Sequence, residues 1–278
     1  MERVKRVFVP VPIAGISHRA LAIVLLSVTV ASVGNAQMKR PADEDQSFKF
    51  GIEAGNGWHK QLGEFSGPCG CALEEGATGS GFVGSLLVEL PSVSSFTFGL
   101  KAGIDYKNAT GSRQQAESVV IINPSTIDTG YVLAGIPIAE VGTYKLTYLF
   151  AAPYVQYRII SEGAFIQIGP SLSILAASHF VQTREMPATV SVQGQTIYNP
   201  RFGNSGTSSE VVEDGAIPNV SSLRVSALLS TGWNIPLWGI TLAPMVTYDL
   251  PLTTVRDQNA SGWKVSSLYA TVALKFGL

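Results

Sequence analysis

Residues 96–107, FTFGLKAGIDYK, alternate without exception between apolar and polar or small side chains. The apolar set holds Phe96, Phe98, Leu100, Ala102, Ile104 and Tyr106. The other set holds Thr97, Gly99, Lys101, Gly103, Asp105 and Lys107. A period of two indicates a β-strand, because successive side chains leave a strand on opposite faces. One face of this strand must therefore contact apolar material along its whole length.

The same period recurs along the chain, and the connections between the alternating segments alternate in length. The segments are 48–59, 81–90, 96–107, 144–159, 164–180, 222–233, 239–250 and 264–278. Short connections (91–95, 160–163, 234–238) alternate with long ones (60–80, 108–143, 182–221, 251–263). Short turns at one end and long loops at the other are typical of outer-membrane barrels. The pattern predicts an all-β fold, an eight-stranded antiparallel up-and-down transmembrane β-barrel. Because 108–143 is apolar enough to form an extra hairpin, ten strands are the alternative.

Alternation alone does not say which face of the barrel meets water, since a soluble barrel also has alternating strands. Most apolar sets here contain no charge, and the polar sets are thin for a water-facing surface. Aromatic residues near strand ends are typical of an interfacial girdle. They are Trp58, Phe96, Tyr106, Trp233, Trp238 and Trp263. We therefore expect the apolar faces to contact lipid.

Segment 144–159 is the exception, because its apolar residues change parity. Tyr144, Leu146 and Tyr148 occupy even positions, whereas Val155 and Tyr157 occupy odd ones. One extra residue near Ala151–Pro153, a β-bulge, would keep all of them on one face. We therefore expect that bulge.

The N-terminal segment has the pattern of a secretory signal peptide. Several arginines and lysines precede the apolar run ALAIVLLSVTVASVG, and small residues stand at the cleavage positions of VGNAQ. We expect residues 1–36 to be a signal peptide, 37–46 a periplasmic leader and 47–278 the barrel. The formal net charge of −1 gives no case for nucleic acid as a partner.

Several segments resemble one known family. They are FKFGIEAGNGW, SGPCGCALEEGATGSGF, FTFGLKAGIDY, LTYLFAAPYVQYRI, AFIQIGPSLSIL and WKVSSLYATVALKFGL. Together they look like the outer-membrane β-barrel domain family often labelled PorT-like or "porin family", and the resemblance covers residues 47–278. It implies an integral outer-membrane barrel, usually without an assigned substrate, whose last strand is read by the barrel-insertion machinery. We expect outer-membrane lipid and lipopolysaccharide as its surroundings.

Charged residues on the polar faces form the candidate site. An eight-stranded barrel is only wide enough for side chains to fill its lumen, so charges there must pair. We expect a structural polar network of Lys49, Glu53, Lys101, Asp105, Lys145, Arg158, Arg224, Asp249 and Lys275. A conduit or anion site made by an excess of cations is the alternative.

Other chemistry has weaker support in the sequence. Cys69 and Cys71 would form a small loop disulfide in an oxidising compartment. His59 and His179 lie near the outer ends of their segments, where rim enzymes place acid–base groups, but no recognisable spacing accompanies them. We expect no enzyme, no cofactor and no metal. The expected role is structural or surface-binding through the long outer loops, with transport, a pore or secretion as the alternative.

Overall fold

The computed structural model describes residues 47–63, 65–66, 72–73, 76–91, 95–122, 130–160, 163–192, 195–203, 205–217, 219–256 and 262–277. These residues belong to one compact unit, Glu44–Leu278. The expected signal peptide, leader and cleavage site lie outside the described residues. Among the residues that are described, no helix is long and apolar enough to cross a membrane.

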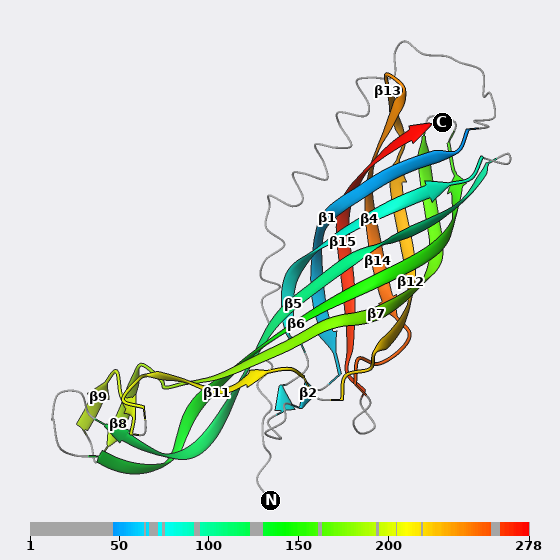
Figure 1. Cartoon of the computed structure of the whole chain (residues 1–278). Coiled ribbons are helices and arrows are strands. Elements are labelled where there is room, and N and C mark those ends of the chain that lie inside the picture. The colour runs from blue at the N-terminus through cyan, green and yellow to red at the C-terminus, as the bar shows by residue number, and fades with distance from the viewer. Residues whose placement is uncertain are drawn as a thin grey trace, which may run out of the picture. The chain divides into compact units, whose positions relative to one another are not determined.

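Eight strands pair in sequence order into a closed antiparallel ring (Figure 1). They are β1 (Lys49–Leu62), β4 (Thr78–Glu89), β5 (Phe96–Ile122), β6 (Gly130–Arg158), β7 (Ala164–Glu185), β12 (Leu223–Trp233), β14 (Ile240–Pro251) and β15 (Lys264–Gly277). The ring closes where β15 pairs with β1, with Phe50 opposite Phe276 and Ile52 opposite Leu274. Closure leaves no open edge in the ring. The predicted eight-stranded antiparallel barrel is confirmed.

The strands are staggered around the ring. Paired residues lead from Trp58, near the loop end of β1, through Leu268, Tyr248, Leu229, Ile168 and Val155 to Phe98, near the start of β5. A row of hydrogen-bonded residues therefore descends most of the barrel as it passes round it. Such a stagger corresponds to strands tilted by about 35–45° from the barrel axis.

Side chains alternate between the lumen and an apolar outer belt. Outward side chains at the centre of the belt include Ile52, Leu86, Leu100, Ile168, Leu229 and Val272. On every strand the outward positions between the two ends of this belt carry no charge; Asn56 and Thr231 are the polar side chains among them. Aromatic pairs lie near both ends: the rings of Phe96 and Tyr157 are tilted at 46° to each other, and those of Phe82 and Tyr106 are stacked.

One end of the barrel has tight turns. β4 joins β5, and β6 joins β7, through the short connections 90–95 and 159–163. Between β12 and β14 the chain forms β13 (Ile235–Leu237), which pairs with the start of β14. Trp238 and Gly239 both have positive φ at its tip, 42° and 89°, the backbone of a type I′ hairpin turn. The Trp238 side chain is fully exposed there.

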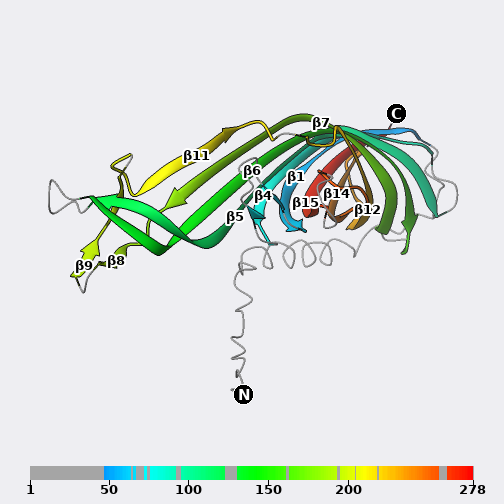
Figure 2. The same ribbon diagram turned by 90° about the horizontal axis from the view of Figure 1, so that it is seen from below.

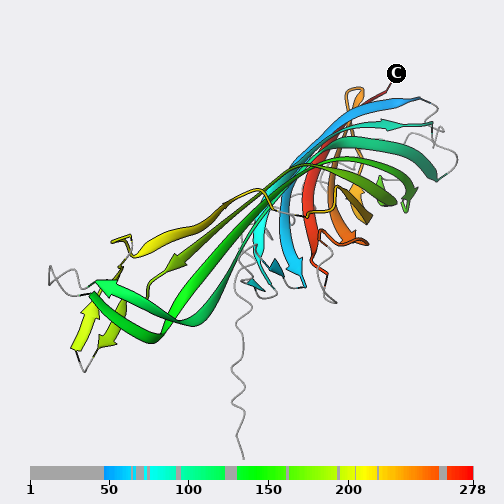
Figure 3. The same cartoon turned by 60° about the horizontal axis from the view of Figure 1, so that its bottom comes forward.

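At the other end, β5, β6 and β7 continue beyond the ring as a curved sheet that we call the arm (Figure 2). β11 (Ser209–Gly215) pairs with the end of β7, and β10 (Arg201–Phe202) pairs with the end of β5. A hairpin of β8 (Thr189–Val192) and β9 (Gln195–Tyr198) lies at its far end (Figure 3). The first long loop contains a smaller hairpin, β2 (Phe65–Ser66) with β3 (Ala72–Leu73).

The arm has an apolar core of its own. Its buried members are Val119, Ile136, Ile138, Met186, Val190, Ile197 and Phe202. Residues 113–122 and 130–140 prolong β5 and β6 rather than forming two further strands of the ring, so the ten-stranded alternative is wrong.

The structure also corrects the expected faces of β6. Tyr144, Leu146 and Tyr148 point into the barrel and are buried, whereas Lys145 is exposed on the outer face. Parity is constant through Ala151–Pro153, so the bulge expected there is wrong. The register shift lies instead on β7, between Leu175 and Ala177.

The reason for the error is that the loop end of the lumen is itself apolar. Tyr144 stacks edge-on against Trp263, with ring centroids 4.9 Å apart. Trp263 is 2% exposed and belongs to the lumen, so the expected girdle position of this residue is also wrong.

Candidate functional site

The lumen contains a charge network centred on Lys107. Its ammonium lies 2.9 Å from Asp105 Oδ2 and 3.1 Å from Asp249 Oδ2, and it donates to Ser267 Oγ at 2.6 Å and to the Tyr269 hydroxyl. β5 and β14, which carry Lys107 and Asp249, lie on opposite sides of the ring. Their side chains therefore meet across the whole width of the lumen.

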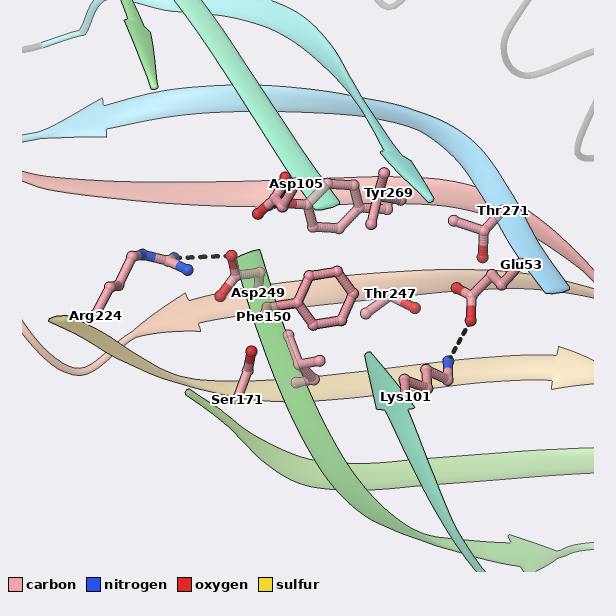
Figure 4. A pocket seen from close by; sticks show the side chains of 12 residues that line it. Glu53, Lys101, Asp105, Phe150, Ser171, Arg224, Thr247, Asp249, Tyr269 and Thr271 are labelled. Atoms are coloured by element: carbon pink, nitrogen blue, oxygen red, sulfur yellow. Dashed lines mark hydrogen bonds and ion pairs between the residues drawn. The ribbon is translucent and has the colours of Figure 1, made fainter. Parts of the chain in front are cut away.

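Asp249 and Asp105 each have a second partner. The Arg224 guanidinium lies 2.8 Å from Asp249 Oδ2 and also donates to the Val265 carbonyl at 3.1 Å. The Tyr269 hydroxyl donates to Asp105 at 2.8 Å. Figure 4 shows Arg224 and Asp249 at one end of this network and Glu53 with Lys101 at the other.

Two more ion pairs continue the network towards the short-turn end. Lys101 Nζ lies 2.7 Å from Glu53 Oε2, and Lys275 Nζ lies 2.6 Å from Glu89 Oε1. The Tyr154 hydroxyl donates to the same Glu89 oxygen at 2.9 Å. All four charged groups are at most 7% exposed.

The buried lumen charges balance. The cations are Lys101, Lys107, Arg224 and Lys275, and the anions are Glu53, Glu89, Asp105 and Asp249, so the charges of these eight residues sum to zero (4 − 4). These eight residues alone therefore show no excess of cations that would favour an anion site. Burying such charges is tolerated because each is paired and hydrogen-bonded.

A cavity of about 40 Å³ lies within the network. Asp249 Oδ1, Arg224 Nε and Thr271 Oγ1 are buried without a hydrogen-bond partner in the protein, and all three residues line the cavity. Since one water needs roughly 10–15 Å³ of such volume, this cavity has room for about three waters. It has no room for a nutrient-sized solute.

Apolar side chains fill the lumen on both sides of the Lys107–Asp249 ion pair. Towards the short turns lie Leu87, Phe165, Ala243, Met245 and Ala273. Towards the loops lie Ala77, Ala109, Tyr144, Leu146, Tyr148, Phe180, Ile217, Val255, Trp263 and Val265. Ile217 and Val255 come from the long loops, so the loops themselves contribute to the closure.

The predicted network residues fall into three groups. Glu53, Lys101, Asp105, Arg224, Asp249 and Lys275 are buried together in the lumen. Lys49 and Arg158 are half-buried near the short-turn end, and Lys145 lies on the outer face. The network also includes Lys107, Glu89 and Tyr269. The sequence pattern was enough to place these three residues in the lumen, because each has the lumen-facing parity of its strand.

His59 lies in the lumen rather than at the rim. Its Nδ1 is 2.9 Å from Ser267 Oγ, the hydroxyl that Lys107 also contacts, and the side chain is 2% exposed. His179 is on the outer face, where its Nε2 lies 3.0 Å from Asp214 Oδ1. Ser178 has the opposite parity to His179, so the two do not form a nucleophile–base pair.

A second charged cluster crosses the base of the arm. Glu210, Arg184, Glu140 and Arg113 are successive cross-strand partners on β11, β7, β6 and β5, with alternating sign. Arg184 also bonds Glu117, four residues further along β5 than Arg113. Burial and the neighbouring Glu117 raise the pKa of the Glu140 carboxyl. This row separates the arm core from the apolar closure of the lumen.

Cys69 and Cys71, the predicted disulfide, lie outside the described residues. No group of three or more metal-ligating side chains occurs among the residues that the structure describes.

Similarity to known proteins lies in structure rather than in sequence. No family model and no curated protein matches the chain. Solved structures with a related arrangement include Ail, the attachment invasion locus protein of Yersinia pestis (12% identity, TM-score 0.30, covering 83% of this chain and 99% of that chain). They also include outer membrane protein AlkL (10%, 0.40, 88% and 96%) and the Escherichia coli outer membrane protease OmpT (10%, 0.31, 86% and 99%).

At these identities the neighbours are similar in fold alone, and the barrel rests on the strand pairing of this chain. The resemblance to the PorT-like family stays a prediction.

Proposed function

We propose that the protein is an integral outer-membrane barrel that anchors a surface-exposed binding arm. The apolar belt supports the membrane location, because its outward positions lack charge on all eight strands. A water-facing surface of this size would carry many charges, whereas an Arg or Lys facing mid-bilayer on a barrel costs about 2–4 kcal/mol.

The filled lumen is the observation that favours an anchor over a pore. Ion pairs join opposite walls at Lys107 and Asp249, and apolar clusters lie on both sides of them. Opening a path for solutes would require breaking several buried ion pairs at once, each costing a few kcal/mol. Transport through the axis is therefore not proposed.

The arm supports a binding role at the cell surface. β5 and β6 run without interruption from the membrane belt into the arm, so the barrel holds the arm rigidly. Its core and its charged row stabilise it as a folded platform rather than a loose loop. Binding elements carried on such loops are common where a rigid scaffold positions them. We propose no enzymatic activity, because His179 pairs with Asp214 on the outer face and the adjacent Ser178 points to the other face of β7.

Two measurements test this function. Planar-bilayer recording of the purified mature protein should show no steady conductance, and a stable open channel would rule out the anchor. Cysteine labelling of intact cells, with Cys69 and Cys71 replaced by Ser, tests the orientation. Ser205→Cys on the arm should react with an impermeant maleimide, whereas Pro236→Cys at the opposite end should react only after permeabilisation. The reverse pattern would place the arm in the periplasm.

A further inference from the structure

The outer belt ends in cations on the side from which the arm projects. On β1 the outward residue after Trp58 is Lys60. On β15 the positions of outward parity beyond Leu268 are Ser266, which is buried, and then the half-buried Lys264. On β6 they are Thr147 and then Lys145, beyond Leu149. In each case the lysine is the first charged outward side chain beyond the belt.

These lysines lack counter-ions within the described part of the chain. None of Lys60, Lys145 and Lys264 forms an ion pair with another described residue. On β7, the outward basic side chain of the same zone is His179, which lies 3.0 Å from Asp214 Oδ1. Three ammonium groups therefore face the zone just outside the apolar belt with unmatched positive charge.

The opposite end of the belt is different. Outward residues at the short-turn end are apolar or aromatic, among them Phe48, Leu90, Phe96, Tyr157, Ile159 and Phe276. The described outward positions there carry no cation. A surface that met the same lipid headgroups in both leaflets would have no reason for this asymmetry.

Lys60 and Lys264 are close enough to share one anion. Lys60 is paired with Ser266, and Leu62 is paired with Lys264, so the two lysines are diagonal neighbours on adjacent strands. Diagonal neighbours on a sheet face lie about 7–8 Å apart, within reach of two flexible lysine stems. The exposed Thr78 is the cross-strand partner of Lys60 on the other side and adds a hydroxyl donor.

We propose that these lysines form a binding surface for the phosphate groups of a phosphorylated glycolipid of the outer leaflet, the lipid A part of lipopolysaccharide. Lys60 and Lys264 hold one phosphate, and Lys145 contacts a second molecule on the other side of the barrel. The acyl chains lie along the belt below, beside Trp58 and Leu268. Lysine suits this role because its flexible stem lies on apolar surface while its charge reaches the headgroup. The inference rests on the proposed outer-membrane location.

The test compares two triple variants of the full mature protein in detergent. Lys60→Gln/Lys145→Gln/Lys264→Gln removes the charge, and Lys60→Arg/Lys145→Arg/Lys264→Arg keeps it. Native mass spectrometry with added lipid A should show adducts on the parent and the Arg variant. The Gln variant should bind lipid A about 25-fold more weakly at the site that Lys60 and Lys264 share, since each cation near an anionic surface contributes roughly a factor of five. A control variant, Lys49→Gln/Arg158→Gln/Arg201→Gln, removes the same charge elsewhere and should bind normally.

The probes distinguish the sources of binding. Lipid A stripped of its phosphates should lose binding to the parent protein, while phosphatidylglycerol and inorganic phosphate should bind more weakly than lipid A. Equal binding by the Gln variant, or equal binding of the stripped lipid or of phosphatidylglycerol, would overturn the inference. Heat-modifiable gel mobility reports separately whether each variant forms the barrel in membranes. A parent protein that never enters the membrane would contradict the proposed function instead.

Discussion

Lys107 and Asp249 face each other from opposite sides of an eight-stranded ring, and their charged atoms meet at 3.1 Å. The pair ties the two walls of the barrel together at its centre. Arg224 on β12 and Asp105 on β5 extend it into a four-residue cluster of alternating charge. The filled lumen depends on this cluster.

Replacing Asp249 by Asn should lower the free energy of unfolding by about 3–5 kcal/mol, because Lys107 and Arg224 would then lie buried beside each other without their shared carboxylate. The measurement is urea unfolding in detergent or vesicles. The double variant Lys107→Met/Asp249→Asn should lose less free energy of unfolding than the two single variants lose in sum, and the difference should be about 0.5–3 kcal/mol. Strict additivity would mean that the two side chains do not interact. The outward Lys145→Met is the control and should change stability by less than about 1 kcal/mol.

An arginine in the middle of the belt should be far more harmful than one beyond it. Leu229 is 53% exposed on the outward face of β12, and Thr110 is exposed on β5 beyond the belt. Leu229→Arg should lower the free energy of unfolding by about 2–4 kcal/mol, and Thr110→Arg should lower it by about 0–1 kcal/mol. Heat-modifiable gel mobility measures the fraction of folded protein for each variant. Equal yields of folded protein would show that the outward face does not contact lipid.

Two glycines at adjacent register positions of β4 and β5, on opposite faces of the wall, provide a matched pair. A Cβ on Gly103 would lie 2.0 Å from the carbonyl oxygen of Gly84 and 2.6 Å from Ser85 Cα, both backbone atoms, whereas a Cβ on Gly84 would meet nothing within 4 Å. Gly103→Ala should therefore prevent normal pairing and sharply reduce folded protein. Gly84→Ala should leave stability within about 0.5 kcal/mol of the parent. Comparable behaviour of the two variants in unfolding experiments would contradict the register described here.

The arm should lose its structure without loss of the barrel when its core is damaged. Ile138 is fully buried in the arm core, so Ile138→Ala should cost the arm about 2–5 kcal/mol. Limited proteolysis of intact cells should then cut the arm rapidly, while the barrel remains in the outer membrane. Gln114→Ala, an exposed change on β5, should leave the arm protected. Simultaneous loss of the barrel would show that arm and barrel fold as one unit.

Period-two alternation was enough to predict the ring, because each face of a strand in a closed barrel has one kind of environment. Lengths of the connections then predicted which ends carry the loops. The same logic failed on β6, where Tyr144 and Tyr148 have the composition of a lipid-facing set but fill the lumen. An apolar lumen mouth and a lipid contact leave the same pattern in the sequence, so Lys145 was expected on the wrong face.

Contacts across the lumen could not be predicted from single strands. Lys107 and Asp105 lie on one strand, but their partners Asp249 and Tyr269 come from strands on other sides of the ring. Which lumen residues meet depends on the stagger of the whole barrel. The arm could not be predicted for a similar reason. The apolar pattern of 113–140 is compatible both with an extra pair of strands in the ring and with an extension of β5 and β6.

Fractionation of cells that express the full-length chain tests the central claim most directly. The account predicts that the mature protein stays with the outer-membrane pellet after washing with alkaline carbonate and urea, and that it requires detergent for extraction. It should then migrate faster in unheated than in heated gel samples, as a folded barrel does. Recovery of folded mature protein in the aqueous periplasmic fraction, without detergent, would contradict the account, because the apolar belt would then have to meet water.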